Sequence, residues 1–117
     1  IAYRIEYVDD TKATMLLMNG LVGDFTFAAR IKGQSAPLST LFYLPPVPNV
    51  MYSAELMAKA ETTFMTGKSP YPLERTLLTT GLVEACVQSA SKEQTRVETP
   101  HLAVTYAVGP ESLFAQD

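Results

Sequence analysis

The chain has one histidine, His101, and it is the natural candidate for proton transfer. Imidazole titrates near neutral pH, which suits general acid or base chemistry. His101 follows Pro100, where a strand is expected to begin. No orienting carboxylate or nucleophile can be assigned to it, so the simpler interpretation is a strand-end histidine bonded to a neighbouring carbonyl. We keep His101 as a candidate substrate-binding residue.

Two further candidates lie near the start of an expected helix. Tyr71 stands between Pro70 and Pro72, which restrict its backbone and suit a contact residue as well as a packing residue. Arg75 could clamp an anion or a neighbouring domain, and a solvated or ion-paired arginine is the alternative. We therefore place Tyr71 and Arg75 beside His101 as candidates for binding a substrate.

Three other kinds of site are not indicated. Cys86 is the only cysteine, so no intramolecular disulfide forms, and it lies on the apolar stripe of an expected helix, as a buried structural cysteine would. Cys86 and His101 belong to no ligand cluster that would hold a metal. Gly20 and Gly23 lack the G-x-G-x-x-G spacing and join two expected strands. We expect no catalytic residue, no metal and no cofactor-binding residue in this chain.

The charge balance argues against nucleic acid and membrane partners. Nine basic and twelve acidic residues give a net charge of -3, without a basic run that could neutralise several phosphates. No apolar run approaches the roughly 20 residues that span a bilayer. The 117 residues, 47% of them apolar, match one domain with a core. These features predict a cytoplasmic protein with one domain.

The first 44 residues follow the two-residue period of β-strands. Tyr3, Ile5 and Tyr7 illustrate it, because they alternate with charged side chains. Four strands are expected, near residues 3–7, 11–18, 24–32 and 38–44. Each ends at residues that favour turns or interrupt a ladder: Asp9-Asp10, Asn19-Gly20, Gly33 and Pro45-Pro46.

Two helices are expected after Asn49. The first should take Ser53 as its N-cap and end at Gly67. The second should start with Pro72 near its first position and run to about Ser89. From Arg96 onward the two-residue period returns and predicts one more strand. Its apolar positions are Leu102, Val104 and Tyr106.

A glycine inside the second expected helix requires an explanation. Gly81 costs about 1 kcal/mol relative to alanine in a helix. We expect another backbone to approach closely at this point.

The order of elements is ββββααβ, which favours an α+β fold. We expect a mainly antiparallel sheet of about five strands with both helices packed on one face. The run Met15, Leu16, Leu17 and Met18 is apolar on both faces, and helices on one side would cover only one of them. The run is therefore a candidate interface, and the alternative is that these residues are tolerated at the surface.

The helical half resembles a known family. The stretch from Glu61 to Pro70 reads Glu-Thr-Thr-Phe-Met-Thr-Gly-Lys-Ser-Pro, a helix then ends near Ser89, and Arg96-Val97-Glu98 follows. This pattern, over roughly residues 54–98, resembles the end of oxidoreductases of the glucose-fructose oxidoreductase and inositol dehydrogenase family. The resemblance implies a two-domain enzyme. Its C-terminal α+β half would shape the substrate cleft and present an open sheet face to another subunit.

The family's catalytic residues have no counterpart in this chain. Its cofactor glycines and its Glu-Lys-Pro motif belong to the dinucleotide-binding half. Its paired Asp and His, four residues apart, are not matched, since Val97 stands four residues before His101. No catalytic role is therefore transferred to any residue here.

Together these inferences predict that residues 1–117 form one α+β domain, the C-terminal part of a longer protein, because the chain opens in strand-like alternation at Ile1 without an initiator Met. The predicted function is a substrate wall and oligomerisation domain of an NAD(P)-dependent oxidoreductase, inactive alone. Its partners would be the N-terminal dinucleotide-binding domain, which would bind NAD or NADP, and further copies of the protein. The alternative is a free-standing α+β module that dimerises or binds a small ligand without catalysis.

Overall fold

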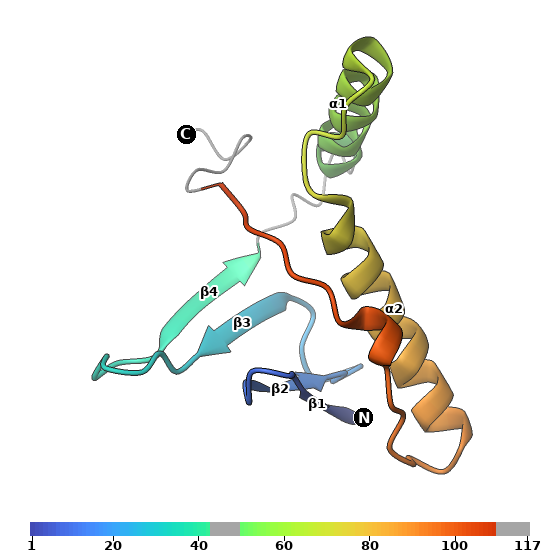
Figure 1. Cartoon of the computed structure of the whole chain (residues 1–117). Helices are drawn as coiled ribbons and strands as arrows, with labels where there is room; N and C mark the ends of the chain where they lie inside the picture. The colour runs from blue at the N-terminus through green and yellow to red at the C-terminus, as the bar shows by residue number, and fades with distance from the viewer. Residues whose placement is uncertain (43–49, 110–117) are drawn as a thin grey trace.

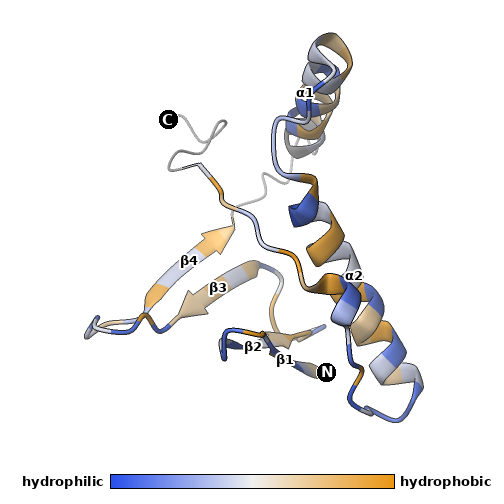
Figure 2. Cartoon of the chain, viewed as in Figure 1, coloured by the Kyte–Doolittle hydropathy of each residue, from blue (hydrophilic) through white to orange (hydrophobic). Residues whose placement is uncertain are grey.

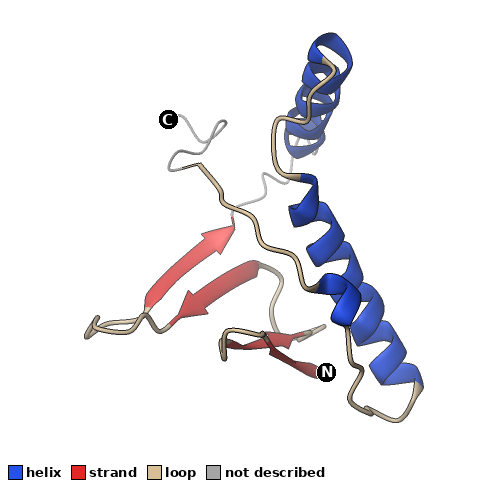
Figure 3. Ribbon diagram, viewed as in Figure 1, coloured by secondary structure: helices blue, strands red, loops and turns tan. Residues whose placement is uncertain are grey.

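The structure is a computed structural model, and it describes residues 1–42 and 50–109 as two β-hairpins followed by two helices (Figure 1). The elements, in chain order, are β1 (Ala2–Glu6), β2 (Lys12–Leu16), β3 (Phe25–Ala29), β4 (Leu38–Phe42), α1 (Val50–Thr66), α2 (Leu73–Ser91) and the short 3₁₀-helix η1 (Pro100–Leu102). Strands, red in Figure 3, precede the helices, blue, along the chain, so the α+β class is confirmed.

The first hairpin pairs β1 with β2 in antiparallel register. Tyr3 lies opposite Met15 and Ile5 opposite Ala13, so these residues share one face. The turn has the chemistry expected of two aspartates. Asp10 adopts a φ of 65°, and Asp9 accepts a hydrogen bond from the Thr11 amide at 3.0 Å.

The second hairpin pairs β3 with β4, also antiparallel. Phe25 lies opposite Phe42, and Ala29 opposite Leu38. Gly33, in the connection between the two strands, has a φ of 86°, a conformation that favours glycine. The expected strand limits are confirmed to within a few residues. The expected closure of the fourth strand at Pro45 falls outside the described residues.

The expected single sheet of five strands is wrong. The described residues form two separate two-stranded sheets, and no ladder joins them. The region from Arg96 enters η1 and then an extended segment, where a strand was expected. Pro100 is the first residue of η1 and lacks an N–H, while the Leu102 side chain packs on α2, so this region follows the helix.

Helix α1 starts earlier than its sequence suggests. It begins at Val50, which places Ser53 inside the helix and not at its N-cap. Its end is as expected. Gly67 has a φ of 67°, and its amide donates a hydrogen bond to the Thr63 carbonyl at 2.9 Å.

Helix α2 begins one residue after Pro72, which is its N-cap. The Arg75 amide donates to the Pro72 carbonyl at 3.1 Å. The helix runs two residues past the expected Ser89, to Ser91, where Lys92 donates its amide to carbonyls of the last turn. Its stripe of half-buried residues comprises Leu78, Leu82, Ala85, Cys86 and Ser89.

Little apolar surface is buried among the described residues. Among the described residues, Leu102 is the one buried hydrophobic side chain, at 7% exposure. The described elements pack mainly in three pairs, β1 with β2, β3 with β4, and α2 with η1. The expected packing of both helices on one sheet face is therefore not observed. Figure 1 shows the hairpins lying apart from α1.

Candidate functional site

The start of α2 brings two of the predicted residues together. Tyr71 is half-buried just before the helix, and the Arg75 guanidinium carbon lies 5.2 Å from the centre of its ring. This is a cation–π contact, which restrains both side chains. Ser69 adds to the local order, because its hydroxyl donates to the Tyr71 carbonyl at 2.5 Å. The pair could therefore present a cation beside an aromatic edge.

His101 lies elsewhere along the helix. It is an exposed residue of η1, next to Leu102, whose side chain meets α2 at Gly81. Six residues separate Arg75 from Gly81, which is about 9 Å along a helix axis. Within the described ranges, the His101 side chain forms no hydrogen bond, and it makes no ion pair or ring contact with Tyr71 or Arg75. A shared role in substrate binding for these three residues stays a prediction.

Residues 1–42 and 50–109 contain no cluster of side chains suited to a metal, and they contain the one cysteine. No group of three or more His, Cys, Asp or Glu side chains lies close enough to hold a metal ion in that part of the chain. Cys86 is a free, half-buried thiol on the side of α2 that its stripe occupies. No helix in the described residues has the length and apolar character to cross a membrane.

The candidate interface Met15–Met18 lies at the end of the first hairpin. Met15 shares the half-buried face of Tyr3 and Ile5, whereas Leu16, opposite Ala2, points to the other face and is 57% exposed. The pairing continues past the strand, since Leu17 and Ile1 exchange backbone hydrogen bonds. The run is thus held in extended form with apolar side chains on both faces. Its role as an interface stays a prediction.

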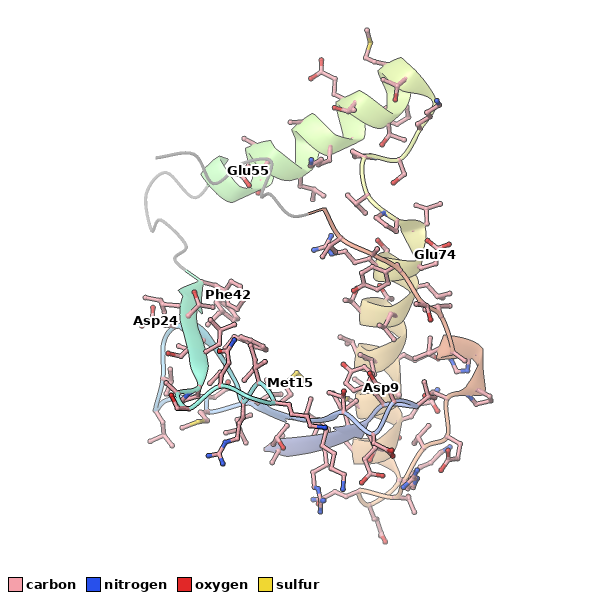
Figure 4. All side chains as sticks on the ribbon, turned by 60° about the vertical axis from the view of Figure 1, so that its left-hand side comes forward. Asp9, Met15, Asp24, Phe42, Glu55 and Glu74 are labelled. Atoms are coloured by element: carbon pink, nitrogen blue, oxygen red, sulfur yellow. The ribbon has the colours of Figure 1, made fainter. Side chains whose placement is uncertain are left out.

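The second hairpin presents an apolar face that the sequence analysis did not single out. Phe25, Phe27, Leu38 and Phe42 lie on one side of β3 and β4, and all are exposed, Phe25 at 64% and Phe42 at 55%. Figure 2 shows the apolar end of β4, and Figure 4 marks Phe42 on this hairpin and Met15 on the other. The two-residue spacing of Phe25 and Phe27 was the signal for a shared face. That Leu38 and Phe42 share this face follows only from the strand register, which the sequence does not show.

A polar contact joins β1 to the segment that follows α2. The Arg96 guanidinium lies 2.9 Å from Glu6 of β1 and 2.5 Å from Glu98. Glu98 first, and then Glu6, raise the pKa of Arg96 above its ordinary value by accepting its hydrogen bonds. All three side chains are exposed, so we assign this contact a role in alignment and little stability. The sequence carries no signal for a pair 90 residues apart.

The described residues therefore leave apolar surfaces exposed and bring Tyr71 and Arg75 together. Comparisons of the chain with protein-family models, curated proteins and solved structures found no match.

Proposed function

We propose that this chain is an assembly domain. In this proposal it is the C-terminal substrate wall and oligomerisation part of an NAD(P)-dependent oxidoreductase. A separate N-terminal dinucleotide-binding domain holds NAD or NADP and carries the hydride chemistry, and the chain is inactive alone. A single cysteine suits a reducing compartment, so we place the assembly in the cytoplasm.

The observation that supports an assembly role is the exposure of the apolar side chains. Leu16 on the first hairpin, Phe25 and Phe42 on the second, and Phe64 on α1 are all exposed. Phe25 and Phe42 lie opposite each other on one face of the second hairpin, and exposed apolar patches mark interaction sites in soluble proteins. A partner that buries these faces would supply the hydrophobic stabilisation that the described chain lacks.

The link to oxidoreductases depends on the resemblance of residues 54–98 to the glucose-fructose oxidoreductase and inositol dehydrogenase family. In this proposal, Tyr71 and Arg75 face the substrate cleft from the start of α2, and His101 faces it from η1. The cation–π contact between Tyr71 and Arg75 supports a preorganised binding edge. An anionic or hydroxylated small molecule would suit such an edge.

The second candidate is a free-standing α+β module that dimerises or binds a small ligand. The exposed apolar faces of the hairpins and α1 support this candidate as well. A partner protein would bury these faces, and no cofactor is needed for that. The coding sequence upstream of Ile1 separates the two candidates. A strand followed by G-x-G-x-x-G there supports the enzyme, and a translation start immediately before Ile1 supports the module.

The oligomerisation role is tested by a charge placed on the open side of the first hairpin. Leu16→Lys should convert an oligomer into a folded monomer, because burying the new ammonium opposes association. The lost leucine burial alone, about 2 kcal/mol, would weaken association by about 30-fold. Sedimentation velocity reports the mass, and circular dichroism reports the fold.

The matched control is Val8→Lys, which replaces an apolar residue that is 96% exposed in the hairpin turn. This variant should keep the sedimentation profile of the unmodified chain. If Leu16→Lys sediments as the unmodified chain does, the oligomerisation face is not here.

A further inference from the structure

The turn that follows β2 places an asparagine directly before a glycine, at Asn19 and Gly20. The Leu21 amide donates to the Met18 carbonyl at 2.9 Å, which closes a β-turn with Asn19 and Gly20 in its two central positions. Gly20 has a φ of 81°, a value that favours glycine. Both central residues are exposed, so the turn presents them to solvent.

The groups that could react in this turn are not held in place. Among the described residues, the Asn19 side chain and the Gly20 amide have no hydrogen-bond partner. Beyond its chain neighbours, no described atom lies within 4 Å of the place where residue 20 would carry a Cβ. The bond that closes the turn joins residues on either side of the Asn19–Gly20 peptide, so this peptide can rotate while the bond persists. Rotation brings the Gly20 nitrogen toward the side-chain carbonyl carbon, Cγ, of Asn19.

We propose that Asn19 is a site of spontaneous deamidation. The Gly20 nitrogen attacks Cγ of Asn19, so a bond forms between these atoms while the bond from Cγ to Nδ2 breaks. The leaving nitrogen takes the proton of the glycine amide and departs as ammonia, which leaves a cyclic imide. Water then opens the imide. Opening at Cγ gives aspartate, and opening at the backbone carbonyl gives isoaspartate, in which the chain runs through Cβ and Cγ. No atom is oxidised or reduced, and water is the co-reactant.

The following residue explains why this asparagine should react first. Asn49 is the other asparagine of the chain, and Val50 follows it. A β-branched side chain crowds the amide nitrogen of its own residue, whereas glycine has no Cβ. The nitrogen that must attack is therefore open after Asn19 and shielded after Asn49.

Deamidation changes both the charge and the backbone of the turn. A neutral amide becomes a carboxylate, so the net charge of the chain goes from -3 to -4. Isoaspartate also inserts an extra carbon into the backbone between Met18 and Leu21, whose hydrogen bond closes the turn. The new charge directly follows Met18, the last residue of the candidate interface. The reaction requires no partner, so it goes beyond the proposed function, and its failure would leave that function untouched.

Peptide mapping tests the site. The full chain is incubated in mildly alkaline buffer, digested with trypsin and analysed by mass spectrometry. Cleavage after Lys12 and Arg30 isolates residues 13–30 with Asn19, and cleavage after Lys32 and Lys59 isolates residues 33–59 with Asn49. Peptide 13–30 should gain about 1 Da, the difference between an amide and a carboxyl group, while peptide 33–59 keeps its mass. Asn19→Asp supplies the aspartyl peptide, from which the isoaspartyl peptide separates by chromatography.

Two glycine variants identify the attacking nitrogen. Gly20→Ala should slow the reaction of Asn19 severalfold, because the added methyl group crowds the nitrogen. The rates are compared in urea, where the strain of alanine at a φ of 81° plays no part. Gly23→Ala is the matched control, since it leaves the Asn19-Gly20 pair intact, and it should not change the rate.

The rate in the folded chain tests the turn itself. It should lie within about tenfold of the rate in urea, because an exposed turn opens at little cost in free energy. A peptide 13–30 that keeps its amide mass would overturn the inference, as would deamidation of Asn49 at the same rate. So would equal rates for Gly20→Ala and the unmodified chain, or a folded chain protected by more than this margin.

Discussion

Gly81 and Leu102 are both buried and lie in close contact. Leu102 fills the space in which any other residue at position 81 would place its Cβ, and that atom would lie 2.8 Å from Leu102 Cδ1. The glycine predicts a close approach of another backbone at this point, and the structure places a side chain there. The helix accepts a glycine because the leucine uses the vacant volume.

Gly81→Ala should therefore destabilise the chain although alanine favours helices. Overpacking costs about 1–3 kcal/mol and the gain in propensity offsets about 1, so we expect a net loss of about 1 kcal/mol. The urea midpoint measures this change. In a Leu102→Ala background the same substitution should become stabilising, because the obstruction is gone.

Gly23→Ala is the matched control, since no atom lies within 4 Å of a Cβ at that position. It should leave stability unchanged or slightly raised. If Gly81→Ala changes the urea midpoint equally in the unmodified chain and in the Leu102→Ala chain, the contact between Gly81 and Leu102 is contradicted.

At the scale of an element, the β1–β2 hairpin depends on its acidic turn. The Thr11 amide and hydroxyl both donate to Asp9, and they lower the pKa of its carboxyl below the ordinary value of 3.8. The folded hairpin therefore prefers the ionised carboxylate. The contribution of this carboxylate to the free energy of unfolding is complete above the pKa of Asp9 in the unfolded chain, near 3.8. It is lost as the pH falls through the lower pKa of the folded chain.

A carboxyl titration followed by NMR should place the pKa of Asp9 below 3.8 in the folded chain. Thr11→Val keeps the amide donor and removes the hydroxyl, so the pKa should rise part of the way toward its ordinary value. Asp9→Asn should abolish the acid sensitivity of this turn. A carboxyl that titrates at or above 3.8 would contradict the hydrogen bonding of the turn.

Local patterns predicted the elements well. The alternation around Ile5, the turn at Asp9 and the helix end at Gly67 depend on neighbours in sequence, and the structure confirms them. The predicted start of α1 at Ser53 was wrong. Serine is a favourable N-cap residue, but the helix begins earlier, at Val50, and includes Ser53.

Long-range relations were harder to predict. Leu102, Val104 and Tyr106 alternate with other residues whether this region pairs in a sheet or packs on a helix. The alternation therefore could not identify η1. The candidate site was predictable only where residues are close in sequence. Tyr71 and Arg75, four positions apart, meet, and the separation of His101 from them required the structure.

The whole molecule is expanded for its length. Its radius of gyration is 16.8 Å, whereas about 13 Å is typical of a compact domain of this size. Its three packed pairs, the two hairpins and α2 with η1, each bury little. Stability of this protein should therefore depend on what covers its surfaces.

We expect the unfolding midpoint to rise with protein concentration. For a dimer, an increase of about 100-fold in chain concentration should add about 2.7 kcal/mol by mass action. Urea titrations across that range measure the shift. A chain carrying Leu16→Lys should show a midpoint that depends less on concentration. A constant midpoint for the unmodified chain would contradict an assembly domain.

The short loops within the packed pairs also have a kinetic consequence. The turn from β1 to β2 spans a few residues, and Leu102 reaches back only to Gly81. Contacts so local form quickly, because little chain entropy is lost in closing them. The hairpins and the α2–η1 unit should therefore form early in folding, before the chain associates with its partner. The slow step would then be second order, faster in a crowded solution and slower on dilution.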